Sequence, residues 1–348
     1  MGTDRVIEWL LEPDNPPVRY LTLTNLLCRP AGDRDVRSAK ASLMDYPVTQ
    51  AILRRAGQFL DDDENAYWKY TGKYWQLIFL GQYLADGRDP RIAQLVESIL
   101  SRPKWVTKAG GQCLTANILA AATRLGYDAH PVVEEQREAL ARRIVAESGI
   151  QCSVMDYSLL PCCHMAQPKL LLCFVQAPPK KRSAAVRSAI ERLVNDLVTN
   201  EVFVYLPGNR RQWQSLLEQR QPSGAELPKG QTVKAWVARQ RESFLAGPGF
   251  GEREPKTGWL KFGFPLHYNS DVLEAMYALA LAGTPYSPPL HRALQAIRDK
   301  QTRDGRWILE NTLNGKMLAD VEKKGGPSKW LTYFARYVLR HFGEPTAS

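Results

Sequence analysis

The sequence predicts an all-α protein, and three features of the chain support this. An amphipathic helix, a short turn rich in Gly, Pro and Asp, and a more polar second helix recur about every forty residues. In one copy the apolar residues follow the spacing of a helix with one buried face, at Val272, Leu273, Met276, Leu279 and Ala280. Strand signals are nearly absent, since the stretch EVFVYL from Glu201 is the only short β-like run.

The repeated helix pairs can be placed in order along the chain. A looser first pair is expected in 18–44, and a single final helix in 328–342. Between them, clear pairs begin at Tyr74, Cys113, Cys163 and near Asn269. Helix pairs that repeat in this way stack either into an open superhelix or into a closed toroid.

The composition is typical of a globular protein with a sizeable core. The chain has 348 residues, of which 44% are hydrophobic, and no apolar run approaches the ~20 residues needed to span a bilayer. The N-terminal stretch contains acidic residues and no small-residue cleavage site, which argues against a signal peptide. Six scattered cysteines do not form a disulfide framework in a chain of this size. We therefore expect a cytoplasmic protein with reduced thiols.

The net charge of +10 could indicate nucleic acid, an anionic membrane surface or a phosphorylated substrate as partner. The basic residues are dispersed in short groups such as Arg54-Arg55 and Lys180-Lys181-Arg182, without a run of five. A solvated basic surface is therefore favoured over a nucleic-acid site. The charge does not predict an oligomeric state.

One segment, 206–255, interrupts the repeat and is rich in Pro, Gly, Arg and Gln. Insertions in repeat folds map to loops on one face, often the binding face. We interpret 1–348 as a single domain with this segment inserted. A lid over a cavity, a basic docking element and a plain surface loop remain alternatives for it.

The fourth helix pair ends with Gln301, Gly305 and Trp307 in the pattern Q-x-x-x-G-x-W. This pattern matches the QW repeats that join helices in the terpene-cyclase toroids, where Gly permits the turn and Trp packs across the junction. A buried Trp in such a loop is also a common way to end a helix.

Longer segments resemble a family of poorly characterised bacterial and archaeal proteins that is similar to prenyltransferases and squalene cyclases. The segments that carry the resemblance are 8–27, 70–92, 113–127, 162–172, 258–279 and 305–339. The resemblance covers most of the chain except about 206–255. It implies a terpenoid cyclase-like α/α toroid of about six helix pairs around a central cavity.

Four cysteines and one histidine are candidate metal ligands. In a toroid the starts of consecutive inner helices meet at one rim, which would bring together Cys113, Cys152, Cys163 and His164, with Cys162 as a substitute. Three thiolates and an imidazole suit tetrahedral Zn²⁺, and an iron–sulfur cluster is less favoured. Buried structural thiols are the alternative, because free cysteine is often a core residue.

Asp271 is the leading candidate for catalysis, with His267 and Tyr268 just before it and Asp156 as a further candidate beside the cysteines. An acid in an apolar cavity can act as a general acid because burial raises its pKa. The alternative is that Asp271 caps the helix that follows it. The acidic run Asp61–Glu64 departs from the D-x-D-D motif of class II terpene cyclases and is interpreted as a solvated loop.

Several large side chains are candidates for lining a substrate cavity. Lys169 could face an anionic group, and the aromatic candidates are Trp75, Trp259, Phe264 and Trp330. Aromatic residues at such positions are also frequent in cores.

Two functions from different classes remain after these arguments. The first is a metal-supported α/α-toroid enzyme, with an isoprenoid-like or elongated apolar or amphiphilic substrate in its central cavity. The second is a non-catalytic helical-repeat module that uses its basic surface and the 206–255 segment to bind nucleic acid or another anionic partner. We favour the enzyme, and the sequence does not predict its reaction.

Overall fold

The computed structural model describes residues 4–102, 111–146, 163–205, 227, 229–230 and 253–343. These residues are mostly helical, which confirms the predicted all-α class. The inner helices are α5 (Lys73–Gln82), α8 (Gln112–Arg124), α10 (Ala166–Gln176), α14 (Val272–Leu281) and α16 (Lys329–His341). The outer helices are α6 (Pro90–Leu100), α9 (Pro131–Ala146), α11 (Ala184–Thr199) and α15 (His291–Asp299). The N-terminal helices are α1 (Arg5–Leu10), α2 (Pro16–Leu21), α3 (Arg34–Ala41) and α4 (Pro47–Leu53).

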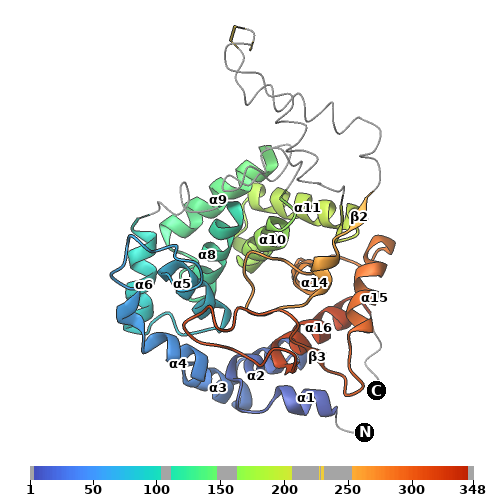
Figure 1. The fold of residues 1–348 in the computed structure, drawn as a ribbon, viewed down its shortest axis with the longest axis horizontal. Helices are drawn as coiled ribbons and strands as arrows, with labels where there is room; N and C mark the ends of the chain where they lie inside the picture. Colours follow the sequence, from blue (N-terminus) through green and yellow to red (C-terminus); the bar gives the residue numbers. More distant parts are fainter. Residues whose placement is uncertain are drawn as a thin grey trace.

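Inner and outer helices differ in how much of their circumference is buried. Every residue of α5 is buried, as is every residue of α10 except Gln176. By contrast, α15 buries only Ala293, Leu294 and Ile297. A helix that is apolar all round needs neighbours on all sides, whereas an amphipathic helix needs only one. The sequence therefore sorts the helices into two layers, which are visible in Figure 1.

The inner helices contact one another in chain order. Helix α5 packs against α8, α8 against α10, α10 against α14, and α14 against α16. Small residues bring the first pair close together, because a Cβ on Gly81 would lie only 2.6 Å from the Cα of Ala121. Each outer helix packs against the inner helix that precedes it, as α6 does on α5 and α15 does on α14.

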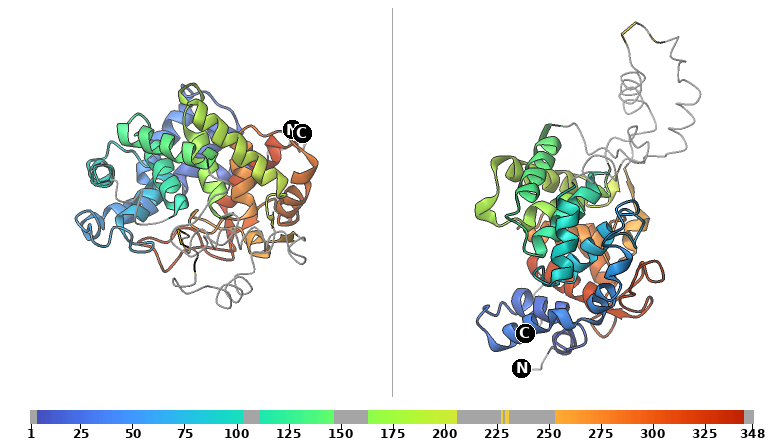
Figure 2. Two further views of the ribbon diagram at one scale, coloured as in Figure 1. Left: turned by 90° about the horizontal axis from the view of Figure 1, so that it is seen from above. Right: turned by 90° about the vertical axis from the view of Figure 1, so that its left-hand side faces the viewer.

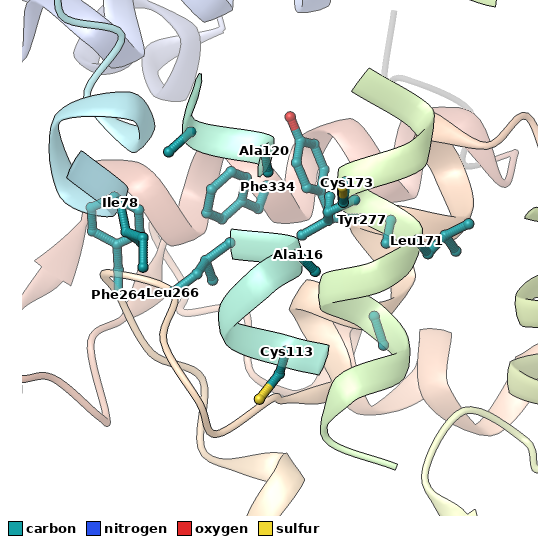
Figure 3. Close-up of a cluster of buried hydrophobic side chains, with 14 of the residues drawn as sticks. Ile78, Cys113, Ala116, Ala120, Leu171, Cys173, Phe264, Leu266, Tyr277 and Phe334 are labelled. Carbon is teal, nitrogen blue, oxygen red and sulfur yellow. The ribbon is translucent and has the colours of Figure 1, made fainter. Parts of the chain in front are cut away.

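The last inner helix also reaches the first one through aromatic side chains. The ring of Phe264 stacks on Trp330 in α16 with a centroid separation of 4.2 Å. The same Phe264 ring lies 6.1 Å from the ring of Tyr83, which follows α5 directly. Figure 3 shows the core between these helices, with Phe264, Ile78 and Phe334 near one another.

The N-terminal helices and the last helix are joined across a long sequence separation. Helix α1 packs against α16, and Asp4 forms an ion pair with Arg336. The right-hand view of Figure 2 shows the N-terminal helices, in dark blue, together at the lower edge of the helical body.

Two short antiparallel strand pairs complete the described fold. Strand β1 (Val204–Tyr205) pairs with β2 (Glu254–Pro255), and β3 (Trp307–Ile308) pairs with β4 (Pro327–Ser328). The first pair brings the described residues at the two ends of the segment predicted as an insertion side by side. Most of 206–255 lies outside the described residues.

The Gln301–Trp307 element follows α15, and the indole of Trp307 donates a hydrogen bond to the end of this helix. Trp307 is buried, and its Nε1 donates to the backbone oxygen of Ile297 at 2.8 Å. Gly305 has a φ of +73°, a conformation that favours glycine. In this turn the tryptophan thus satisfies a carbonyl group near the C-terminus of α15. Among the described helices, none has the length and apolar character to cross a membrane.

Candidate active site

A pocket of about 270 Å³ lies at the N-terminal end of α14. The loop before α14 forms most of its wall, and Met165 from the start of α10 adds an apolar side chain. Three of the residues predicted for function line it, namely Trp259, His267 and Asp271. We call this cavity the Asp271 pocket.

Asp271 is the N-cap of α14 and is buried. Its Oδ1 accepts a hydrogen bond from the backbone N of Glu274, and its Oδ2 accepts one from the backbone N of Gly263, each at 2.8 Å. Glycine is required at 263 because a Cβ there would lie 2.8 Å from the carbonyl oxygen of Asn311. The predicted capping role is therefore present, and it places the same carboxyl group on the pocket wall.

The environment of Asp271 favours its neutral form. Burial and the neighbouring Glu274 carboxylate raise its pKa from 3.8 to about 7, although the two backbone N–H groups and Lys169 act in the opposite direction. At neutral pH this carboxyl group exists in both protonation states. It can therefore donate or accept a proton without a large free-energy cost.

A fully buried ion pair lies one helical turn below Asp271. Nζ of Lys169 in α10 contacts Oε2 of Glu274 in α14, and both side chains are inaccessible to solvent. Burial also raises the pKa of Glu274. Lys169 was predicted to face an anionic substrate, and in the structure its partner is this carboxylate.

His267 is buried beside the Asp271 pocket as a neutral imidazole. Burial, followed by the positive charges of Lys169 and Lys69, lowers its pKa to about 3. Its Nδ1 accepts a hydrogen bond from the backbone N of Asn269 at 3.4 Å, so the proton of the neutral ring belongs on Nε2. The ring can thus act as a hydrogen-bond donor near Asp271.

Tyr268 does not line the Asp271 pocket, whereas His267 and Asn269 on either side of it do. Its hydroxyl contacts the hydroxyl of Tyr67, and its ring packs edge-on against Trp75 with centroids 4.9 Å apart. Burial, the contact with Tyr67 and the nearby Cys113 thiol raise the pKa of Tyr268. The Tyr67–Tyr268 contact brings the starts of α5 and α14 to the same end of the fold.

The start of α10 lies at this end as well. The hydroxyl of Ser270 donates to the backbone oxygen of Met165 at 2.8 Å, which joins the residue before Asp271 to the N-cap of α10. We call this end, which carries the first residues of α5, α10 and α14, the N-terminal rim.

The candidate metal ligands are only partly covered by the described residues. Cys152, Cys162 and the catalytic candidate Asp156 lie outside them. Cys113 is buried near the start of α8, and Figure 3 shows its sulfur at the opposite end of the core from Cys173. The described part of the chain contains no group of three His, Cys, Asp or Glu residues arranged to hold a metal ion.

His164 is a neutral imidazole, and one of its ring nitrogens forms no hydrogen bond to a described residue. Its ring stacks on Tyr205 with centroids 3.4 Å apart, and burial, followed by the charge of Lys256, lowers its pKa to about 2. Nδ1 of His164 is buried and has no hydrogen-bond partner in the described part of the chain. A neutral imidazole with an unpaired nitrogen is the form that binds metals.

The predicted aromatic lining is divided between the pocket and the core. Trp259 lines the Asp271 pocket. The rings of Trp75, Phe264 and Trp330 are fully buried and contact other aromatic rings, so they form part of the core. Sequence reasoning missed Glu274 and Gly263. The backbone N–H groups of both residues hold the Asp271 carboxyl group, and the Glu274 carboxylate raises its pKa.

No protein-family model, no curated protein sequence and no solved structure matches this chain. The resemblance to prenyltransferases and squalene cyclases therefore stays a prediction from sequence. The arguments for function rest on the geometry of the N-terminal rim.

Proposed function

We propose that the protein is an enzyme that uses Asp271 to transfer a proton to or from a small apolar or amphiphilic substrate in the Asp271 pocket. The observation that supports this most strongly is a buried carboxyl group on the wall of a pocket, beside a neutral imidazole. Surface carboxyl groups are ionised at neutral pH, whereas Asp271 retains a proton that it can donate.

The pocket lining combines apolar and polar side chains, which favours an amphiphilic substrate. Met165, Trp259 and Leu266 supply apolar surface, while His267 supplies a donor for an oxygen atom. An isoprenoid-like molecule with a hydroxyl or carbonyl group meets both requirements.

We further propose that the inner helices form a closed α/α toroid. The contacts of successive inner helices and the Tyr83–Phe264–Trp330 aromatic cluster support closure between α5 and α16. The helix-ending role of Trp307 supports the assignment of the QW element. In such a ring the N-terminal rim would be the mouth of the central cavity.

Zinc at the N-terminal rim is the second part of the proposal. The unpaired Nδ1 of His164 supports it, because a neutral imidazole nitrogen without a hydrogen-bond partner can bind Zn²⁺. The other ligands would be the thiolates of Cys113, Cys152 and Cys163. A zinc ion there would fix the starts of α8 and α10, or supply a Lewis acid beside the pocket.

The proton-transfer proposal can be tested without knowing the natural substrate. The purified protein is incubated in D₂O with linear isoprenoid alcohols and alkenes, and mass spectrometry measures deuterium on carbon. Straight-chain alcohols serve as non-isoprenoid controls. We expect deuterium incorporation by the wild-type protein, and a loss of about 10²–10⁴-fold in the rate for Asp271→Asn.

Asn is as good an N-cap as Asp, so Asp271→Asn should keep the capping bond from the backbone N of Glu274, while its amide nitrogen cannot accept the bond from Gly263 N. Asp33→Asn is a control for the loss of an N-cap carboxylate elsewhere, because Asp33 caps α3 with its Oδ1 and lines neither pocket. Equal incorporation rates for wild-type protein and Asp271→Asn would contradict the proposal. So would the absence of incorporation from every isoprenoid tested.

A further inference from the structure

A second pocket, of about 230 Å³, lies at the start of α5. It is formed by the turn at Gln58 and Phe59, the stretch from Asp62 to Lys73, and the side chain of Leu318. None of these residues lines the Asp271 pocket. We call this cavity the Trp68 pocket.

Trp68 exposes its indole in this pocket although its backbone is held tightly. Its side chain is 63% exposed, the largest fraction among the exposed large hydrophobic residues of the described chain. Its backbone N donates to the oxygen of Asn65 at 2.7 Å, and its own oxygen accepts from Gly72 N at 2.8 Å. A Cβ on Gly72 would lie only 2.6 Å from the backbone N of Trp68. The loop thus presents a flat apolar ring to solvent from a fixed position.

The polar groups around the indole are of mixed type. The Asp62 carboxylate is fixed by hydrogen bonds from the backbone N and from Nδ2 of Asn65, at 2.9 and 3.0 Å, and these bonds lower its pKa. In the part of the chain that the structure describes, the side chains of Gln58 and Thr71 form no hydrogen bond. Donors and acceptors are therefore both available to a ligand.

The charges around the pocket are balanced, which excludes a simple anion site. Nζ of the buried Lys73 contacts Oδ1 of Asp63, and Arg102 contacts Oδ2 of the same carboxylate. The cation in the pocket wall is therefore already paired with a carboxylate, while Asp62 would repel a phosphate or carboxylate. The only other aromatic residue in the described lining, Phe59, is buried, and one exposed ring is a poor site for an organic cation.

We propose that the Trp68 pocket binds a neutral pyranose sugar, whose apolar C–H face stacks on the indole of Trp68. The hydroxyl groups of the ring are donors and acceptors, which matches Asp62, Gln58 and Thr71. A wholly apolar ligand would leave these groups desolvated and unpaired. The volume of the pocket corresponds to a single sugar ring.

The test is a binding titration of the purified chain with methyl glycosides of glucose, galactose and mannose, followed by isothermal calorimetry and ligand-detected NMR. We expect one glycoside to bind with a Kd on the order of 1 mM. Trp68→Ala should weaken this binding by at least about tenfold, while Trp68→Phe should keep it within about threefold, because the aromatic platform remains.

Tyr286→Ala is the matched control, because Tyr286 is an exposed aromatic residue, 52% accessible, that lines neither pocket. It should leave glycoside binding unchanged. The proposal is overturned if none of the glycosides binds, if Trp68→Ala binds as the wild-type protein does, or if inorganic phosphate or tetramethylammonium displaces the sugar. Because Asp271→Asn should bind the sugar normally, this result is independent of the proposed proton transfer.

Discussion

Asp271 and Glu274 are coupled through a single turn of helix. Oδ1 of Asp271 accepts a hydrogen bond from the backbone N of Glu274 at 2.8 Å, while the carboxylate of Glu274 raises the pKa of Asp271. Asp271, the N-cap of α14, is thus held by the backbone of Glu274, and the carboxylate of Glu274 disfavours the ionisation of Asp271. Lys169, which contacts Glu274, favours the charged form of this second carboxylate, while burial raises the pKa of Glu274. Two buried ionisable groups, Glu274 and Lys169, thus influence the protonation of Asp271, which lines the pocket.

The raised pKa of Asp271 predicts a pH-dependent stability that one substitution should remove. The folded protein binds this proton up to pH 7, whereas the unfolded chain releases it near pH 3.8. Stability should therefore fall as pH rises from about 4 to 7, by at most about 4 kcal/mol from this group. Urea unfolding of wild-type protein and Asp271→Asn at pH 5 and pH 7.5 measures this, and the variant should lose less stability. Parallel pH profiles would show that Asp271 titrates normally.

The Lys169–Glu274 pair predicts a large penalty when only one partner is removed. Glu274→Gln leaves the Lys169 ammonium buried without a counter-charge, which costs about 3–5 kcal/mol of the free energy of unfolding. The double variant Lys169→Met, Glu274→Gln should be more stable than Glu274→Gln alone. Urea titrations of the single variants Glu274→Gln and Lys169→Met, the double variant and the wild type measure the coupling.

A surface pair provides the control for that measurement. Arg142 and Glu138 form an exposed ion pair one helical turn apart. Removing its cation with Arg142→Met should change the stability by less than about 1 kcal/mol. A cost for Glu274→Gln as small as this would mean that the buried pair is solvated in solution.

Much of the fold could be predicted because helical periodicity is a local property. The predicted start at Tyr74 lies next to the observed start of α5 at Lys73, and 328–342 agrees with α16 within a residue at each end. Apolar spacing and the turns between helices are sufficient for this. The arrangement of the pairs depends on contacts between distant residues, such as Phe264 with Trp330.

The site could be predicted only in part, because its properties depend on pairs that are distant in sequence. Asp271 and His267 were identified from their position before a helix. Glu274 was missed, since it looks like one polar residue in an apolar helix and its partner Lys169 is 105 positions away. A charged residue within each of two otherwise apolar helices is a signal that could have found this pair, because such charges must be compensated.

Elemental analysis tests the zinc proposal with little ambiguity. Protein purified without a metal-affinity tag should contain about one zinc per chain, since one set of three thiolates and an imidazole binds one ion. Cys113→Ser and Cys163→Ser should each lose it. Cys28→Ser should keep it, because Cys28 is an exposed cysteine outside the proposed ligand set. Metal-free wild-type protein would assign the rim cysteines to packing and leave the proton-transfer proposal unaffected.

Substitutions at two glycines can separate the cost of backbone strain from the cost of close packing between the Gln301–Trp307 turn and α1. Gly305 and Gly315 have φ values of +73° and +76°, so alanine is strained at both positions. A Cβ at Gly305 would also lie 2.8 Å from Cγ2 of Val6 in α1, whereas a Cβ at Gly315 would have no atom within 4 Å. Gly315→Ala should therefore cost only the conformational strain, about 1 kcal/mol.

Gly305→Ala should cost more than Gly315→Ala by the additional overpacking, about 1–3 kcal/mol in thermal or urea unfolding. Val6→Ala removes the methyl group that Cβ would meet, so in that background the two glycine substitutions should have similar effects. If the difference persists in the Val6→Ala protein, the turn does not depend on the contact with α1. Its disappearance would show that the Gln301–Trp307 turn is fixed in part by the N-terminal helix packed against it.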